Sequence, residues 1–173
     1  MKRFLSFVAL ATLAVAPSAA QAASTPMSAS AIGVGPNGYD FLIGTWACTN
    51  DAPSAVAGPA SSTIAVTKSA AGGALFYRVT GKDFDAATYL TYSPKTKTWW
   101  APTAYADGGY EIESTTDTGP KAVWAGSLVS GGSSKAIPWR DNYTMSSSKL
   151  VDVGQSKATG SWKTQYTVTC TKS

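Results

Sequence analysis

From residue 39 onward the sequence is a succession of short runs rich in Val, Thr, Tyr and Trp, separated by clusters of Gly, Asn, Asp, Ser and Pro. No window has the sustained i, i+3, i+4, i+7 spacing of apolar residues that an amphipathic helix requires. The pattern therefore predicts an all-β domain. Short strands joined by short turns favour an antiparallel meander, and closing a meander removes its unpaired edges. We expect an up-and-down β-barrel of roughly 8 to 10 strands.

The expected strands are separated by turn signals such as "SAAGG", "SPKTKT" and "SGGSS". They cover residues 41–50, 62–68, 74–81, 87–92, 99–104, 109–115, 122–129, 137–146, 150–153 and 160–171.

The N-terminus has the order of segments that is typical of a Sec-type signal peptide. Lys2 and Arg3 precede an apolar run over residues 4–15, and small residues at Ala20 and Ala22 follow it. The run is shorter than the roughly 20 apolar residues that a membrane-spanning helix needs, so we expect cleavage after Ala22 and no membrane span. The predicted organisation is a signal peptide over 1–22, a flexible leader over 23–38 and a single domain over 39–173. We expect an exported protein, either periplasmic or secreted.

Cys48 and Cys170 are the two cysteines of the chain. In an exported protein such a pair favours a disulfide over two free thiols. The bridge would close a very long loop, for which the chain-entropy model gives about 4 to 5 kcal/mol of stabilisation before strain and residual structure reduce it.

Alternation along the first and last expected strands indicates where the cysteines would meet. One face of the last strand holds four residues: Trp162, Tyr166, Val168 and Cys170. The same parity in the first strand gives a second set: Leu42, Gly44, Trp46 and Cys48. If both sets look into one core and the two strands are neighbours, the cysteines can meet across the seam that closes a barrel.

The segment "FLIGTWACT" resembles the Gly-x-Trp signature of the lipocalin (calycin) superfamily, with Gly44 and Trp46 at its fixed positions. Later segments such as "YLTYSPKTKTWW", "DGGYEIEST" and "GSWKTQYTVTC" are similar in order to small exported bacterial lipocalin-like domains of unknown function. The resemblance implies a barrel with Trp46 at one end and a cationic side chain from a late strand packed on its ring. Arg140 and Lys163 are the candidate cations. Arg140 is expected, because alternation places Lys163 on the strand face opposite Trp162, which is the expected inner face.

Aromatic residues and two polar ones are the candidate ligand contacts. A small-molecule pocket is built mostly of apolar and aromatic walls with a few polar groups that orient the ligand. The candidates are Trp99, Trp124, Trp139, Tyr77, Tyr89, Tyr143, Arg140 and Glu113. The alternative is that the aromatics simply fill the interior and rims of a small barrel. Trp99 and Trp100 are adjacent and must point to opposite faces, so at least one of them lies outside the deep core.

Catalytic and cofactor chemistry has little support in the sequence. The chain has no histidine, which removes the commonest general base and excludes histidine-ligated haem. Two acidic pairs remain. Asp83 and Asp85 could bind a hard cation, and Glu111 and Glu113 could do acid/base work. The simpler interpretation is a solvated turn for the first pair and an outward strand face for the second. We therefore expect no cofactor and no metal.

The charge pattern and the predicted fold together limit the function. Lysines are scattered along the chain, so we expect no nucleic-acid partner. We predict a barrel that binds a small apolar or amphipathic molecule without covalent chemistry. One alternative is an enzyme with Asp141 or Glu113 as base, which requires an inward carboxylate with a raised pKa. Another is a cavity-free interaction module, which requires a filled interior and an exposed aromatic patch around Trp99 or Trp100.

Overall fold

The computed structural model describes residues 38–54, 57–69, 74–117 and 119–173. The expected signal peptide lies outside these residues, as does all of the expected leader except Gly38. Within the described part of the chain, no helix has the length and apolarity needed to cross a membrane.

One 3-10 helix, η1 (Tyr39–Leu42), precedes a continuous series of strands. The strands are β1 (Gly44–Asn50), β2 (Ser61–Lys68), β3 (Ala74–Gly81), β4 (Phe84–Ser93), β5 (Thr98–Tyr105), β6 (Tyr110–Thr115), β7 (Lys121–Val129), β8 (Ile137–Met145), β9 (Lys149–Thr159) and β10 (Ser161–Lys172). Each of them overlaps one strand expected from the sequence. The largest differences are at β9, which runs to Thr159, and at the start of the domain, where residues 39–42 form a helical turn.

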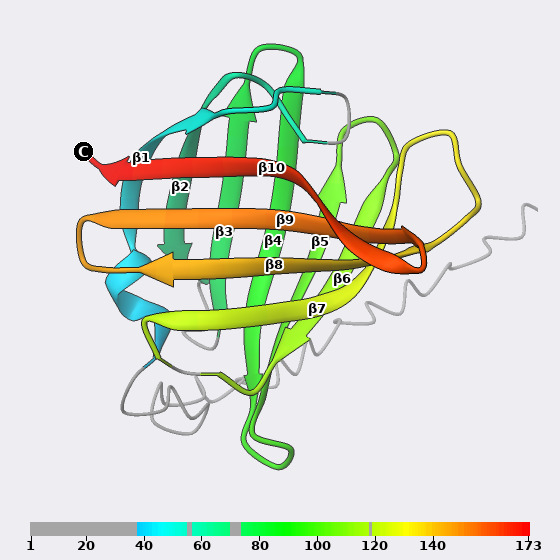
Figure 1. The fold of residues 1–173 in the computed structure, drawn as a ribbon. Helices are drawn as coiled ribbons and strands as arrows, with labels where there is room; N and C mark the ends of the chain where they lie inside the picture. Colours follow the sequence, from blue (N-terminus) through cyan, green and yellow to red (C-terminus); the bar gives the residue numbers. More distant parts are fainter. Residues whose placement is uncertain (1–37, 55–56, 70–73, 118) are drawn as a thin grey trace, which may run out of the picture.

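The strands form one closed antiparallel barrel. Each strand pairs with its neighbours in sequence, and β1 pairs with both β2 and β10. In Figure 1 the strands β7 to β10 cross in front of β2 to β5 at a steep angle, so the barrel has two walls facing each other. The prediction of an all-β barrel of roughly 8 to 10 strands is confirmed.

The seam between β1 and β10 carries the disulfide. Cys48 lies opposite Cys170 in the strand register, and the two sulfur atoms are bonded. Both side chains are buried. The predicted bridge is confirmed, and it links the first strand of the barrel to the last.

The helical turn η1 plugs one end of the barrel. Its Tyr39 and Leu42 side chains are almost fully buried. Tyr39 packs against the rings of Trp99 and Trp124, and its hydroxyl donates to the carbonyl of Asp117 at 2.9 Å. These contacts form a continuous apolar core at the plugged end.

The cation beside Trp46 is Lys172, and the expectation of Arg140 was wrong. The Lys172 Nζ lies 5.3 Å from the centre of the Trp46 ring and donates to the carbonyl of Phe41 at 2.8 Å. The reason is the register, which sets Lys172 directly opposite Trp46. Arg140 instead lies 4.3 Å from the centre of the Trp162 ring.

The expected inward position of Trp162 was also wrong, because β10 is not a regular strand. Its register against β9 shifts between Ser161 and Lys163 and again between Thr164 and Tyr166. A β-bulge changes which face the following residues occupy. Trp162 therefore packs on Arg140 at the outer wall, whereas Tyr166 points into the barrel.

Replacing Cys48 and Cys170 together by serine is expected to lower the free energy of unfolding by about 2 to 4 kcal/mol. The bridge spans 122 residues, so its loss frees a large part of the unfolded chain. Urea unfolding followed by tryptophan fluorescence measures the change. The native protein in reductant should behave like the double variant, and a loss below about 0.5 kcal/mol would show that the bridge contributes little to stability.

Candidate functional site

Strand β6 presents its charged face to the interior and its apolar face to solvent. Glu111 and Glu113 are only 6% and 5% exposed, whereas Tyr110 and Ile112 are 46% and 44% exposed. The expectation that the two glutamates form an outward face was therefore wrong. The register explains the inversion: Thr115 pairs with Trp99, which packs on the Tyr39 plug, so the residues two and four positions earlier must also face inward.

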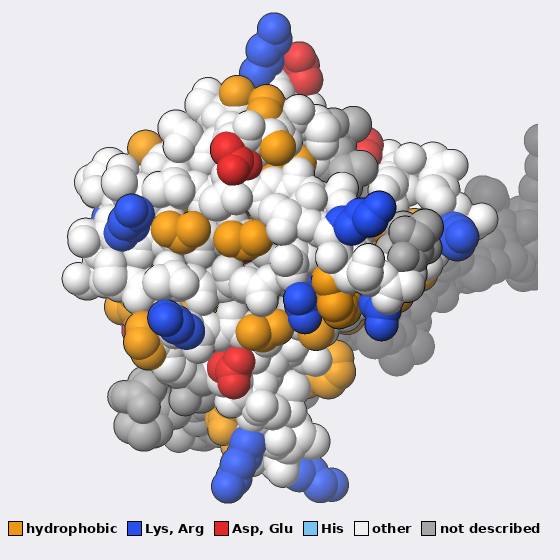
Figure 2. All heavy atoms as spheres, in the orientation of Figure 1, with side chains coloured by type: hydrophobic (Ala, Val, Ile, Leu, Met, Phe, Trp, Pro, Cys, Tyr) orange, Lys and Arg blue, Asp and Glu red, His pale blue; other side chains and the backbone are white. Residues whose placement is uncertain are grey.

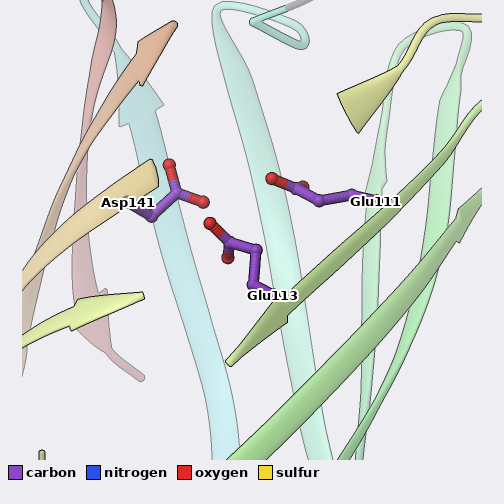
Figure 3. A group of neighbouring side chains, drawn as sticks. All are labelled: Glu111, Glu113 and Asp141. Carbon is purple, nitrogen blue, oxygen red and sulfur yellow. The ribbon is translucent and has the colours of Figure 1, made fainter. Parts of the chain in front are cut away.

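Two aspartates from the opposite wall complete a cluster of four buried carboxyls. Asp141 comes from β8 and Asp152 from β9, and they are 3% and 8% exposed. Figure 3 shows the carboxyl groups of Glu111, Glu113 and Asp141 converging on one point between the strands. One oxygen from each of these three lies within 4.8 Å of the others.

Hydroxyl and indole groups hold part of the cluster in place. Tyr105 donates to Glu111 Oε2 at 2.6 Å. Asp141 Oδ1 accepts from the Tyr166 hydroxyl at 3.0 Å and from the Trp139 indole at 3.2 Å. The Tyr166 hydroxyl also lies 3.3 Å from Asp152 Oδ2. The Tyr166 hydroxyl has only one proton to donate. One of its two hydrogen bonds therefore requires that Asp141 or Asp152 carries a proton and donates it to the Tyr166 oxygen.

A glycine in β9 makes room for Tyr166. A Cβ at Gly154 would overlap the Tyr166 ring, which lies directly opposite it in the register. Gly154 also pairs with Asp141 on its other side. The missing side chain therefore lets the ring lie flat across β9 and brings its hydroxyl to the carboxyl cluster.

Burial raises the pKa of all four carboxyls, because the charged form loses its hydration. For Glu113 the neighbouring charges of Asp141, Glu111 and Asp152 raise the pKa further. Hydrogen bonds from Tyr166, Trp139 and Glu113 oppose the effect of burial at Asp141. Among the four, Asp141 is therefore the carboxyl best prepared to be charged, and Glu113 is held in its protonated form.

The cluster borders a cavity of about 200 Å³ inside the barrel. Tyr39 and Leu42 of the plug form one end of it, and Asn50, Gly58 and Pro59 lie at the other. The wall between them includes apolar residues: Ile64, Val79, Ala86, Leu90, Ala101 and Val168. The cavity is therefore apolar over much of its wall and acidic at one place.

The residues predicted as ligand contacts fall into three groups. Tyr77, Trp124, Tyr143 and Glu113 line the cavity. Trp99 and Trp139 are buried in the barrel but are not part of the cavity wall. Tyr89 is 53% exposed, and Arg140 packs on Trp162. For all eight of these residues, contact with a ligand stays a prediction.

Asp152, Tyr105 and Tyr166 belong to the site although the sequence did not single them out as members of it. Each has a signal that parity alone could have supplied. Asp152 shares a strand face with the buried Leu150, and Tyr105 shares one with Trp99. Tyr166 shares the expected inner face of the last strand with Val168 and Cys170, and it lines the cavity.

The other acidic pair does not belong to this site. Asp85 forms a salt bridge with Arg78 at 2.8 Å, and both side chains are largely exposed. Asp83 lies exposed in the turn between β3 and β4 with a φ of 56°. The predicted turn holds for Asp83, whereas for Asp85 it was wrong, because Asp85 lies in β4 and pairs with Thr80 of β3.

The arrangement is capable of two kinds of chemistry. Three converging carboxyls can hold a cation, and oxygen ligands are the kind that hard metal ions prefer. A proton-bearing Glu113 beside Asp141 can also exchange protons with a bound molecule. No family model matches the chain, and no curated protein matches it either.

The free energy of unfolding of the ligand-free protein is expected to fall as the pH rises from about 5 to about 8. The four carboxyls bind protons more tightly when folded than when unfolded. A carboxyl with a raised pKa gives full stability below its unfolded pKa, near 4, and loses it as the pH rises toward its folded pKa. Urea unfolding across this range measures the slope.

Glu113→Gln should make this slope shallower by up to about 1.4 kcal/mol per pH unit, because one titrating group is removed. Asp83→Asn, a change of the same kind at an exposed turn, is the control and should leave the slope unaltered. If the free energy of unfolding of the native protein instead rises with pH over this range, the four carboxyls do not bind protons more tightly in the folded state than in the unfolded state.

Proposed function

We propose that the protein is exported and binds a small amphipathic molecule, without covalent chemistry, inside its barrel. The observation that carries this proposal is the interior cavity, which joins apolar walls to a group of buried carboxyls. Small-molecule sites commonly combine a mostly apolar surface with a few polar groups at fixed positions. The ligand's apolar part would lie against residues such as Leu90 and Trp124, and its polar part would reach the carboxyls.

The resemblance to lipocalins supports the same function. Gly44 and Trp46, the fixed residues of the Gly-x-Trp signature, stand at the start of the first strand of a closed antiparallel barrel. Lys172 supplies the cation on the Trp46 ring that the resemblance implies. Binding inside such a barrel removes apolar ligand surface from water, which contributes about 25 cal/mol per Å².

Export is supported by two independent features. The N-terminal sequence has the segments of a signal peptide. The Cys48–Cys170 disulfide fits an oxidising compartment such as the periplasm or the cell exterior.

Acid/base catalysis is the second candidate function. The specific observation in its favour is that Glu113 and Asp141 point into the cavity with raised pKa values. Perturbed carboxyls in a cleft are typical of catalytic sites and also of structural networks. Turnover of a bound molecule that is abolished by Asp141→Asn would favour the enzyme over the binding protein.

An interaction module without a cavity has weaker support. Trp100 is 44% exposed next to the buried Trp99, as the opposite directions of adjacent residues require. The interior is not filled, however, since the cavity extends from the η1 plug to Pro59.

Filling the cavity is expected to abolish binding. Ala86 is buried on the cavity wall, so the ring in Ala86→Phe would project into the space that a ligand needs. The probes are benzyl alcohol and benzylamine, which share one ring and differ in their polar group. Ligand-observed NMR titration should show at least about tenfold weaker binding of any probe that the native protein binds.

Ala87→Phe is the matched control. Ala87 follows Ala86 in β4 and faces outward by alternation, so the same added ring should leave binding unchanged. Thermal unfolding checks that both variants fold. Equal binding by the native protein and Ala86→Phe, or binding of neither probe by the native protein, would overturn the proposed function.

A further inference from the structure

Among the described residues that line the cavity, three have a buried carboxyl oxygen without a hydrogen-bond partner. These oxygens are Glu111 Oε1, Glu113 Oε1 and Asp152 Oδ1. Their residues are between 5% and 8% exposed, and all three border the cavity. A buried acceptor without a donor costs free energy, because it has given up water and gained nothing in return. A ligand that brings donors to this place would recover that loss.

In the part of the chain that the structure describes, no cation is paired with this group of acids. Among the described residues that form the cavity wall there is no Lys or Arg, and the chain has no histidine. On the face drawn in Figure 2, the Lys and Arg side chains are scattered over the outer surface. Arg140, next to Asp141 in β8, bonds Gln155 and packs on Trp162, and Lys172 of β10 bonds the carbonyl of Phe41. Buried charges in proteins are normally paired, so a positive partner from outside fits this site.

The donors inside the barrel determine which oxygens are open to a ligand. Tyr105 occupies Glu111 Oε2, and Tyr166 and Trp139 occupy Asp141 Oδ1. Glu111 Oε1, Glu113 Oε1 and Asp152 Oδ1 are left without a donor, and their three residues line the cavity. A primary ammonium group has three N–H donors, which matches three separate acceptors.

The apolar neighbours of the carboxyls favour an organic cation over a metal ion. Glu113 pairs with Ala101 across β5 and β6, and Ala86 and Leu90 lie on the same cavity wall. Ca²⁺ requires six to eight oxygen ligands, and Mg²⁺ keeps several of its waters. An ammonium group on a small carbon skeleton uses both the acidic and the apolar part of the wall.

We propose that the carboxyls of Glu111, Glu113 and Asp152 bind the ammonium group of a small organic amine whose carbon skeleton lies against the apolar wall of the cavity. This inference rests on the proposed function, because it names the chemical class of the ligand. It makes the barrel selective for positive charge, whereas the proposed function by itself requires only an amphipathic molecule.

The test compares three probes that share one ring: benzylamine, benzyl alcohol and benzoate. Near neutral pH benzylamine is a cation, benzyl alcohol is neutral and benzoate is an anion. Ligand-observed NMR titration of the native protein should give benzylamine roughly tenfold tighter binding than benzyl alcohol, and no binding of benzoate.

The variants Glu111→Gln and Asp152→Asn keep the side-chain shape and remove one ionisable carboxyl each, so neither can become negatively charged when an ammonium group binds. Each should weaken benzylamine binding by roughly tenfold and leave benzyl alcohol binding within about twofold. Asp83→Asn, in the exposed turn between β3 and β4, is the matched control and should change neither. The amide that replaces each carboxyl keeps an oxygen that can accept from Tyr105 or Tyr166, so both variants should fold, and thermal unfolding of each verifies this.

Two outcomes overturn the inference while the proposed function stands. In the first, benzylamine and benzyl alcohol bind equally well, or the variants weaken both equally. In the second, CaCl₂ or MgCl₂ binds at lower concentration than benzylamine and displaces it, which would assign the carboxyls to a metal ion. If none of the three ring probes binds, the proposed function fails together with the inference.

Discussion

Pairing of β1 with both β2 and β10 is the constraint on which the rest of the structure depends. A closed barrel has no free edge, so every residue of every strand is committed to the inside or the outside once the register is set. The Cys48–Cys170 bridge lies at this closure and stabilises it. The η1 turn then seals one end, with Tyr39 packed on Trp99 and Trp124. The four carboxyls inside are thereby largely separated from bulk water, with exposed fractions of 3% to 8%.

That separation gives the four carboxyls their chemical character. On an open surface Glu111 and Glu113 would be hydrated and charged, whereas inside the barrel burial raises the pKa of both. The protein places no Lys or Arg among the described residues of the cavity wall, and it gives only some of the oxygens a hydroxyl or indole donor. Structures that keep such unsatisfied groups do so mostly at functional sites. The combination is consistent with a site completed by a ligand.

The agreement between sequence and structure is best where a pattern is local. Strand positions follow from runs of β-branched and aromatic residues between turn signals, and the first and last strands carried enough alternation to bring Cys48 to Cys170. The same reasoning failed at β6 and at the start of β10. In β6 the apolar Tyr110 and Ile112 look like core residues by composition, yet they face solvent. In β10 a bulge reverses the direction of Trp162 relative to Tyr166, and nothing in the local sequence marks the extra residue.

The sequence by itself determined the all-β class, the approximate strands and the pair of cysteines that closes the barrel. The fold class and the strands depend on the preferences of short segments. The disulfide follows because the chain has two cysteines, which within the chain can pair only with each other. Only the tertiary structure decided that Glu111, Glu113, Asp141 and Asp152 meet inside a cavity, and that Lys172 rather than Arg140 covers Trp46. The physical reason is that side-chain direction in a strand has a period of two, so a shift of register by one residue exchanges inside and outside. The register is set by contacts between strands far apart in the chain.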